Sequence, residues 1–277
     1  MIIVGARDSE TRKGNPQAVD LVLRGAALAF KPSSLKNSQQ RESLYREALA
    51  LEPNNTFAMT DLAQTLVFQA SEFPGAFDKR VREKKYVEAR DLALKVKDLD
   101  PGIATVYIVM AMYAFDHDDF DGYRRANETF LSLRPNNSTA HNNLAESYFY
   151  GGEPQRAIEL FNQAIALNPT RQTSARISHL CRAHFMLGDI DATIRLCLQS
   201  LDGNPKNINA RAYLAMAYSV KGDDAKALAA VAELRKLPIG ERPTEEFERP
   251  QPSFPAAYKE WYEKKFLPVA RKVGLWE

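Results

Sequence analysis

Residues 138–169 read STAHNNLAESYFYGGEPQRAIELFNQAIALNP, and this stretch decides the fold. Small and aromatic residues recur in it at helical spacing on both sides of Gly151-Gly152, a pair that breaks the first helix. Pro154 suits the first turn of the next helix. Pro169 ends that helix, because proline lacks an amide N–H and clashes with the preceding turn. The stretch therefore predicts two helices joined by a tight turn.

Prolines that end a helix recur along the chain at a nearly constant spacing. They are Pro53, Pro101, Pro135, Pro169, Pro205 and Pro238. A first interval of 48 residues is followed by intervals of 34, 34, 36 and 33. A period near 34 residues that closes on proline is typical of helix–turn–helix solenoids. We therefore expect about six helix pairs, more than the three or so that stable stacking requires.

The best-formed unit resembles the tetratricopeptide repeat (TPR). The residues that match its pattern are Leu144, Ala145, Tyr148, Ala157, Phe161, Ala164 and Pro169, while His141 stands where a Trp is usual. The resemblance implies an all-α protein, a right-handed α–α superhelix (TPR solenoid) of about six helix pairs with a C-terminal capping helix. Solenoids of this kind bind other chains on their extended surfaces. A protein or peptide partner is thus expected, and enzyme activity is not.

The repeat pattern divides the chain into four segments. They are a flexible N-terminal segment (1–15), the TPR array (16–238), a Pro-rich linker (239–255), and a C-terminal capping helix with its tail (256–277). Trp261, Phe266 and Leu267 give the last segment an apolar face that would cover the final helix pair. The alternative is an amphipathic helix held for a partner or a membrane surface. Pro268 predicts a kink in this helix.

Composition narrows the function classes. Hydrophobic residues make up 45% of the chain and charged residues 26%, and a net charge of +2 is too small to indicate nucleic-acid binding. No apolar run approaches the 18 or so residues that a membrane span needs, so no membrane insertion is expected. Cys181 and Cys197 are expected to be reduced, buried thiols of a cytoplasmic protein. The alternative is a redox-sensing pair, because their two positions face each other within one repeat.

Two polar stretches could be mistaken for functional sites. Asp116-His117-Asp118-Asp119 has metal-ligand chemistry, but it aligns with the interhelical turns of the other units, where acidic residues cap helices. We therefore expect a turn. The interruption between Ala70 and Tyr86 contains the basic run Asp78–Lys85, which is expected to extend the following helix through pairs such as Glu83 with neighbouring bases. A docking platform for an acidic partner is the alternative.

A partner-binding groove is expected along the first helices of the repeats. The candidate groove residues are Asn142, Asn143, Glu146, Tyr150, His179, Arg182, Tyr213 and Met216. Some TPR proteins clamp acidic chaperone tails with a set of lysines and asparagines. Asn143 and Arg182 fit such a clamp loosely, but lysines are missing from the inner positions, so no binding of such tails is expected. No phosphate-binding, metal-binding or nucleophile motif is found, and we predict no cofactor, metal or catalytic residue.

A narrower resemblance concerns the two ends of the array. Asn15–Gly25, the interrupted second unit and Lys265–Leu275 look like the C-terminal TPR region of bacterial class III adenylate/guanylate cyclases. The resemblance implies a regulatory role in cyclic-nucleotide signalling, with a cyclase catalytic domain as partner in cis or in trans. That catalytic domain is absent from this chain. The principal hypothesis remains a non-catalytic scaffold or regulatory module, and it leaves room for a homo-oligomer.

Overall fold

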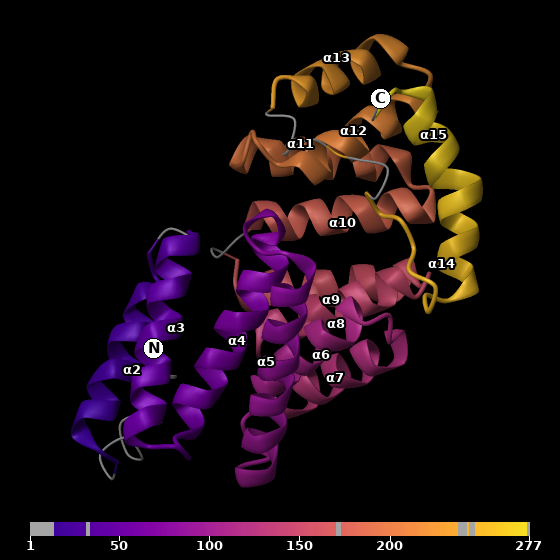
Figure 1. Ribbon diagram of the computed structural model, residues 1–277. Helices are drawn as coiled ribbons and strands as arrows, with labels where there is room; N and C mark the ends of the chain where they lie inside the picture. Colours follow the sequence, from indigo (N-terminus) through magenta and orange to yellow (C-terminus); the bar gives the residue numbers. More distant parts are fainter. Residues whose placement is uncertain (1–13, 32–33, 170–172, 238–242, 244–246, 276–277) are drawn as a thin grey trace. The chain divides into compact units, whose positions relative to one another are not determined.

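The computed structural model describes residues 14–31, 34–169, 173–237, 243 and 247–275 (Figure 1). The regular elements in these ranges are all helical, as the repeat pattern predicts. They form six consecutive pairs: α2 (Pro16–Leu28) with α3 (Leu35–Leu51), α4 (Thr56–Glu72) with α5 (Lys79–Leu99), α6 (Val106–Asp116) with α7 (Phe120–Leu133), α8 (Ser138–Tyr150) with α9 (Pro154–Leu167), α10 (Thr173–Leu187) with α11 (Ile190–Gly203), and α12 (Ile208–Lys221) with α13 (Asp224–Arg235). The predicted flexible segment at 1–15 lies almost entirely outside the described residues.

The chain divides into two compact units. Unit 1 is Met1–Leu133 and unit 2 is Arg134–Glu277. Each unit contains three of the helix pairs, so the division falls within the stretch that the repeat period predicts as one array. The two units are described separately below.

The helix starts follow from the residues that come after the repeat prolines. Asn55 lies two residues after Pro53, and its side chain accepts the backbone N–H of Ala58 at 2.9 Å. Asn137 and Asn207 have the same place after their own prolines and also cap the helices that follow. Such a cap satisfies one of the N–H groups that a helix start leaves without a partner. The recurring proline and asparagine therefore end one helix and begin the next.

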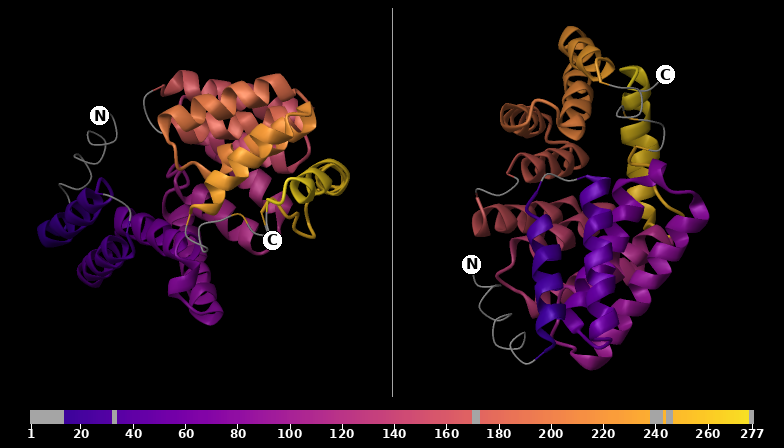
Figure 2. Two further views of the ribbon diagram at one scale, coloured as in Figure 1. Left: turned by 90° about the horizontal axis from the view of Figure 1, so that it is seen from above. Right: turned by 60° about the vertical axis from the view of Figure 1, so that its left-hand side comes forward.

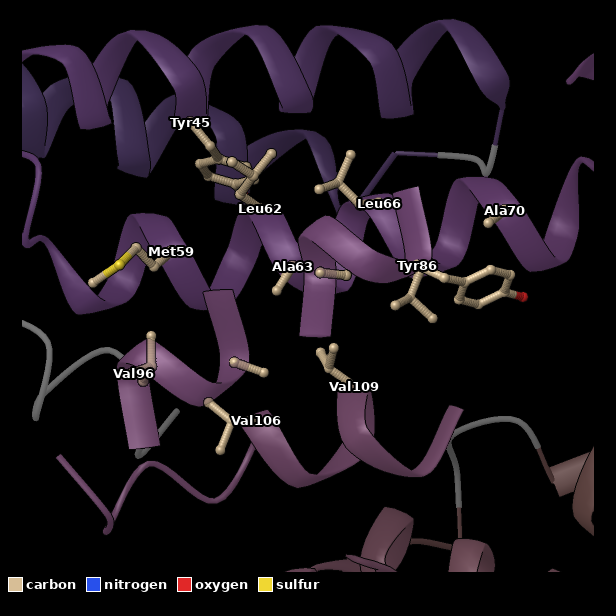
Figure 3. Close-up of a cluster of buried hydrophobic side chains, with 13 residues drawn as sticks. Tyr45, Met59, Leu62, Ala63, Leu66, Ala70, Tyr86, Val96, Val106 and Val109 are labelled. Atoms are coloured by element: carbon tan, nitrogen blue, oxygen red, sulfur yellow. The ribbon is translucent and has the colours of Figure 1, made fainter. Parts of the chain in front are cut away.

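The core of unit 1 lies between α3, α4, α5 and α6. Figure 3 shows its side chains, with Ala70 of α4 near Tyr86 of α5, Leu62 of α4 near Tyr45 of α3, and Val96 of α5 near Val106 of α6. All are nearly or fully buried. Helix α4 has buried residues on several of its faces, which is expected for a helix that packs against two neighbouring pairs.

The interruption after Ala70 adds length to helices. A 3₁₀ turn, η1 (Pro74–Ala76), separates α4 from the 21-residue helix α5, whose N-cap is Asp78. The basic run thus extends a helix, as predicted. The expected pairing of Glu83 with bases on its own helix is wrong, however, because Glu83 contacts His117 at 3.1 Å. His117 closes α6 and brings its ring to that carboxylate from the next helix pair.

The acidic stretch at the end of α6 is a turn, as predicted. Asp119 accepts the backbone N–H of Gly122 at 2.8 Å, at the start of α7, and Asp118 has a positive φ of 57°. His117 stacks on Tyr113 at a centroid distance of 3.8 Å. Among the described residues, no group of three or more His, Cys, Asp or Glu side chains could hold a metal ion.

Unit 2 contains a disulfide that the sequence analysis did not expect. Cys181 of α10 and Cys197 of α11 are bonded, with their Cα atoms 5.5 Å apart. The prediction of two reduced thiols is therefore wrong. The reason is geometric, because both residues face the interior of one helix pair and the distance between their Cα atoms is in the usual range for a disulfide.

In the part of the chain that the structure describes, no helix is both long and apolar enough to cross a bilayer.

The end of the chain folds back on unit 2. We call residues Phe247–Leu275 the tail; it contains α14 (Ala256–Trp261), the π-helical turn η3 (Tyr262–Phe266) and α15 (Leu267–Lys272). Pro268 has no N–H to donate to the turn before it. That turn, Tyr262–Phe266, is π-helical, where the sequence predicted a kink. Helix α15 contacts α12, and Lys272 pairs with Asp224 of α13 at 3.3 Å. The tail therefore reaches the last helix pair, where the sequence places a cap.

Candidate functional site: the tail-binding surface of unit 2

The candidate site is formed by the first helices of the three pairs in unit 2. Helices α8, α10 and α12 contact one another in sequence order. The views in Figures 1 and 2 show the yellow run of α14 and α15 lying crosswise beside these helices. We call the surface that α8, α10 and α12 present to the tail the tail-binding surface. The eight residues predicted from the sequence as a groove lie on these three helices, and the tail contacts three of them, Tyr150, Arg182 and Tyr213.

An ion pair joins the tail to the middle of this surface. The Arg182 Nε of α10 lies 2.7 Å from Glu248 Oε1, and the Arg182 Nη2 donates a hydrogen bond to Glu248 Oε2 at 2.9 Å. The two side chains are only 7% and 4% exposed, so both charges are almost completely removed from water. Two contacts between one guanidinium and one carboxylate fix the direction as well as the distance of the pair.

Two tyrosine hydroxyls complete the polar contacts of the ion pair, one with each partner. The Tyr258 hydroxyl of α14 donates to Glu248 Oε2 at 3.0 Å, and Arg182 donates to the Tyr150 hydroxyl at 3.2 Å. The Arg182 guanidinium also lies 4.5 Å from the centroid of the Phe149 ring. A buried cation is stabilised by both a carboxylate and an aromatic face. Arg182 of α10 and Tyr258 of α14 thus contact Glu248, while Phe149 and Tyr150 of α8 contact Arg182.

Aromatic rings continue the contact on both sides of the ion pair. On the α8 side, Tyr258 lies 5.7 Å from Phe149 and 5.5 Å from Tyr150, measured between ring centroids. Phe254 of the tail lies 5.2 Å from Tyr150. Inclined rings at these distances attract one another in addition to burying apolar area. This aromatic group anchors the start of α14 on the end of α8.

A second aromatic group lies on the α12 side. Tyr213 of α12 has its ring 6.2 Å from Phe247 and 5.9 Å from Phe266. Tyr213 and Phe266 are fully buried. The tail thus contacts the surface at both of its ends, with the charged pair between the two aromatic groups.

Burial and charge shift the pKa values of the groups around the ion pair. Burial alone would lower the pKa of Arg182, but the Glu248 charge outweighs it and raises that pKa well above the usual value. Burial raises the pKa of Tyr258 well above its usual value, and the Glu248 charge adds to the rise. Near neutral pH, Arg182 therefore stays charged and Tyr258 keeps its proton, so the contacts persist.

A neighbouring pair lies on α8 and α10. Glu146 and His179 contact each other at 3.0 Å. Burial would raise the pKa of the Glu146 carboxyl, but the charge and hydrogen bond of His179 outweigh it and hold that pKa below the usual value. The pair joins the first two helices of the surface next to Arg182.

One glycine allows the tail to approach closely. Gly152 follows α8 with a φ of 76°, a conformation that favours glycine. A Cβ at this position would lie 2.7 Å from the Ala257 Cβ and 2.9 Å from the Tyr258 backbone N. Gly188 has the equivalent turn position after α10 with a φ of 87°, and a Cβ there would meet nothing within 4 Å. Close contact with the tail is thus particular to Gly152.

The structure places the eight predicted groove residues on α8, α10 and α12 and buries three of them. Arg182 is buried under Glu248, and Tyr213 and Met216 of α12 have no exposed surface. Asn142, Asn143, Glu146, Tyr150 and His179 are half-buried. Whether these eight residues bind a partner remains a prediction.

The sequence analysis missed the tail residues that contact the surface. Phe247, Glu248 and Phe254 lie in the stretch predicted as a Pro-rich linker, and Glu248 and Phe254 are buried. Prolines in this stretch break helical periodicity, which was the signal in use. The available hint was that aromatic and acidic residues stand between the prolines of this stretch.

A family model matches one part of the chain. Residues 138–171 match the family model described as tetratricopeptide repeat. No curated protein matches the sequence. The family match includes the helix pair α8 and α9, the first pair of unit 2.

Solved structures show the same fold at low sequence identity. One is a chain of the crystal structure of the APC/C hetero-tetramer Cut9-Hcn1, with a TM-score of 0.66 and 15% identity over 90% of this chain. This chain spans 42% of the length of that one. PilF of Pseudomonas aeruginosa has a TM-score of 0.58 and 16% identity, with 90% of this chain and 98% of that chain covered.

A third structure is YrrB, described as a TPR protein with an unusual peptide-binding site. Its TM-score is 0.50 and its identity 15%, with 68% of this chain and 89% of that chain covered. At these identities the three structures show the fold alone. The chain therefore carries a tetratricopeptide repeat and has the TPR solenoid fold.

Proposed function

We propose that the protein is a non-catalytic scaffold or regulatory module that binds a protein or peptide partner. The observation that carries the proposal is the run of six helix pairs, one of which matches the TPR family model. Repeat arrays of this kind offer extended surfaces whose helices contact only their neighbours, which suits them to hold another chain. YrrB, a protein of similar fold, is described as having a peptide-binding site, in line with such a role.

The titratable groups of the tail-binding surface support binding over catalysis. Arg182 and Glu248 neutralise each other, and Tyr258 donates to the same carboxylate. A general acid or base has to present a proton-accepting or proton-donating atom to a substrate. Here the charged atoms are held by other side chains of the same chain, an arrangement that favours a structural contact.

Two finer predictions remain open. The resemblance to the regulatory region of class III cyclases has no support among the comparisons, and a cyclase domain as partner stays a prediction from the sequence. The cytoplasmic location also stays a prediction. The Cys181–Cys197 disulfide argues against it, because disulfides persist mainly in oxidising compartments.

The proposed role can be tested by capture of a partner. The purified full chain is immobilised and exposed to a lysate of its source cells, and captured proteins are then purified and titrated against it by calorimetry. A partner that binds with defined stoichiometry supports the proposal. Turnover of a small molecule by the chain alone, or capture that is unchanged after the chain is unfolded and re-immobilised, would contradict it.

A further inference from the structure

We propose that the tail is an internal ligand, and that the tail-binding surface takes in its place a partner segment of the same chemistry. That segment has a carboxylate that meets Arg182 and, about ten residues further along, an aromatic residue that meets Phe149 and Tyr150. The inference rests on the proposed function, since it names the kind of partner. The tail and the partner compete for one surface.

The chemistry of the present occupant indicates what the surface selects. The buried charge of Arg182 has a carboxylate partner in Glu248, at 2.7 Å. A buried ion pair contributes little net stability, because both charges lose their hydration, but an unpaired buried charge is strongly unfavourable. A segment that covers Arg182 without a carboxylate is therefore rejected. The surface discriminates by charge before it discriminates by shape.

The aromatic residues set the second requirement. Tyr258 lies ten residues after Glu248, touches the rings of Phe149 and Tyr150, and donates to the same carboxylate. A segment that carries the carboxylate without the aromatic residue would leave Phe149 and Tyr150 more exposed to water. The spacing between acid and ring is thus part of what the surface recognises.

The backbone of the tail suggests why a partner can displace it. Glu248 has a φ of 59°, a left-handed conformation that is unfavourable for a residue with a side chain. The tail helix is interrupted by the π-helical turn Tyr262–Phe266. The left-handed backbone at Glu248 lowers the stability of the docked tail. A separate segment with the same side chains on a relaxed backbone would bind without that loss.

The first experiment supplies the tail in trans. A full-length chain carrying Glu248→Gln and Tyr258→Ala loses the ion pair and the Tyr258 contacts of its own tail, which weakens the docking of that tail and leaves the sequences of α8, α10 and α12 unchanged. A labelled peptide of residues 247–275 is titrated against this chain and against the wild-type chain, with fluorescence anisotropy as the readout. We expect the peptide to bind the double variant at least tenfold more tightly. Equal affinities for the two chains, or no binding to a double variant with wild-type circular dichroism, would overturn the proposal.

Matched variants show whether the peptide uses the same surface. Adding Gly152→Ala to the double variant places a Cβ against Ala257 and Tyr258 of the peptide, and affinity should fall at least tenfold. Adding Gly188→Ala creates the same backbone strain without a tail contact, and affinity should be unchanged. A peptide with Glu248→Gln should bind at least tenfold more weakly than the original. If both glycine variants behave alike, or the Gln peptide binds as well, the assignment of the surface is wrong.

Hydrogen exchange on the wild-type chain tests displacement without any variant. The proposal requires that amides of Ala256–Lys272 exchange well before those of Ser138–Tyr150, because the tail must open while α8 stays folded. Exchange of both segments at one common rate would show that the tail is a fixed part of the fold.

The inference and the proposed function fail in different ways. If a captured partner binds the wild-type chain and the double variant with the same affinity, the inference about the tail is wrong, but the proposed scaffold role still holds. Failure to capture any partner, together with tight binding of the tail peptide, removes the scaffold role but keeps the tail as an internal ligand.

Discussion

Replacing Gly152 by alanine should destabilise unit 2 more than the same change at Gly188. Both glycines have φ values near +80°, at 76° and 87°. An L-residue in the left-handed region costs about 1–2 kcal/mol, so this part of the effect is shared. At Gly152 the new Cβ also lies 2.7 Å from Ala257 and 2.9 Å from the Tyr258 backbone, and a forced contact of that kind costs about 1–3 kcal/mol. We therefore expect a loss of about 1–2 kcal/mol for Gly188→Ala and about 2–5 kcal/mol for Gly152→Ala.

The assay is urea unfolding followed by tryptophan fluorescence. Trp261 is in the tail, 6.0 Å from the Phe149 ring, and reports on the contact between tail and surface. The sequence has two tryptophans, so a Trp276→Phe background makes Trp261 the only one. Circular dichroism of the same samples follows the array. If the two glycine variants lose equal free energy of unfolding by the Trp261 signal, the tail does not approach Gly152 as described.

Three further predictions concern packing, pH and the disulfide. Leu144→Ala should lower the free energy of unfolding by about 2–5 kcal/mol because it leaves a cavity. Ala157→Leu should lower it by about 1–3 kcal/mol because it overpacks the contact between α8 and α9. Unchanged thermal unfolding of both variants would contradict the helix register of α8 and α9. Burial, with the Asp116 charge, raises the pKa of Tyr86 to about 12, so its contribution to stability is complete below about pH 10 and is lost as the pH rises toward 12. Urea unfolding at pH 9 and 11 should show a smaller alkaline loss for Tyr86→Phe than for wild type, and an identical loss would contradict this. Reduction of the Cys181–Cys197 disulfide, which spans 16 residues, should lower the free energy of unfolding by about 3 kcal/mol, and free thiols in the unfolded, unreduced chain would refute the bond.

The paired helices were predictable because their packing is periodic. Leu144, Ala145, Ala157 and Phe161 recur at helical spacing in the sequence, and all four are buried in the structure. Each repeat contacts mainly its neighbours, so a local pattern is enough to place the helices and their turns. The turn at Gly151-Gly152 and the helix end before Pro169 follow from the same local rules.

The tail-binding surface was only half predictable. Arg182 and Tyr150 lie on the expected faces of first helices, so the sequence could place them at a groove. Glu248 is 66 residues from Arg182 and lies outside the repeat, so no period connects the two. The disulfide was not predicted, for a related reason. The repeat places Cys181 and Cys197 opposite each other. However, the repeat pattern depends only on the size of the side chains, so it cannot predict whether the two thiols are reduced or bonded.

The most direct test of the account is a double-mutant cycle on Arg182 and Glu248. Arg182→Met, Glu248→Gln and the double variant are made in the full chain with Trp276→Phe, and unfolding in urea is followed by Trp261 fluorescence. Residues in one buried contact have coupling energies of about 0.5–3 kcal/mol. Because these two side chains meet at 2.7 Å and are 7% and 4% exposed, the account predicts a coupling in the upper half of that range. Additive effects of the two substitutions, with no coupling beyond error, would contradict the claim that this ion pair holds the tail on unit 2.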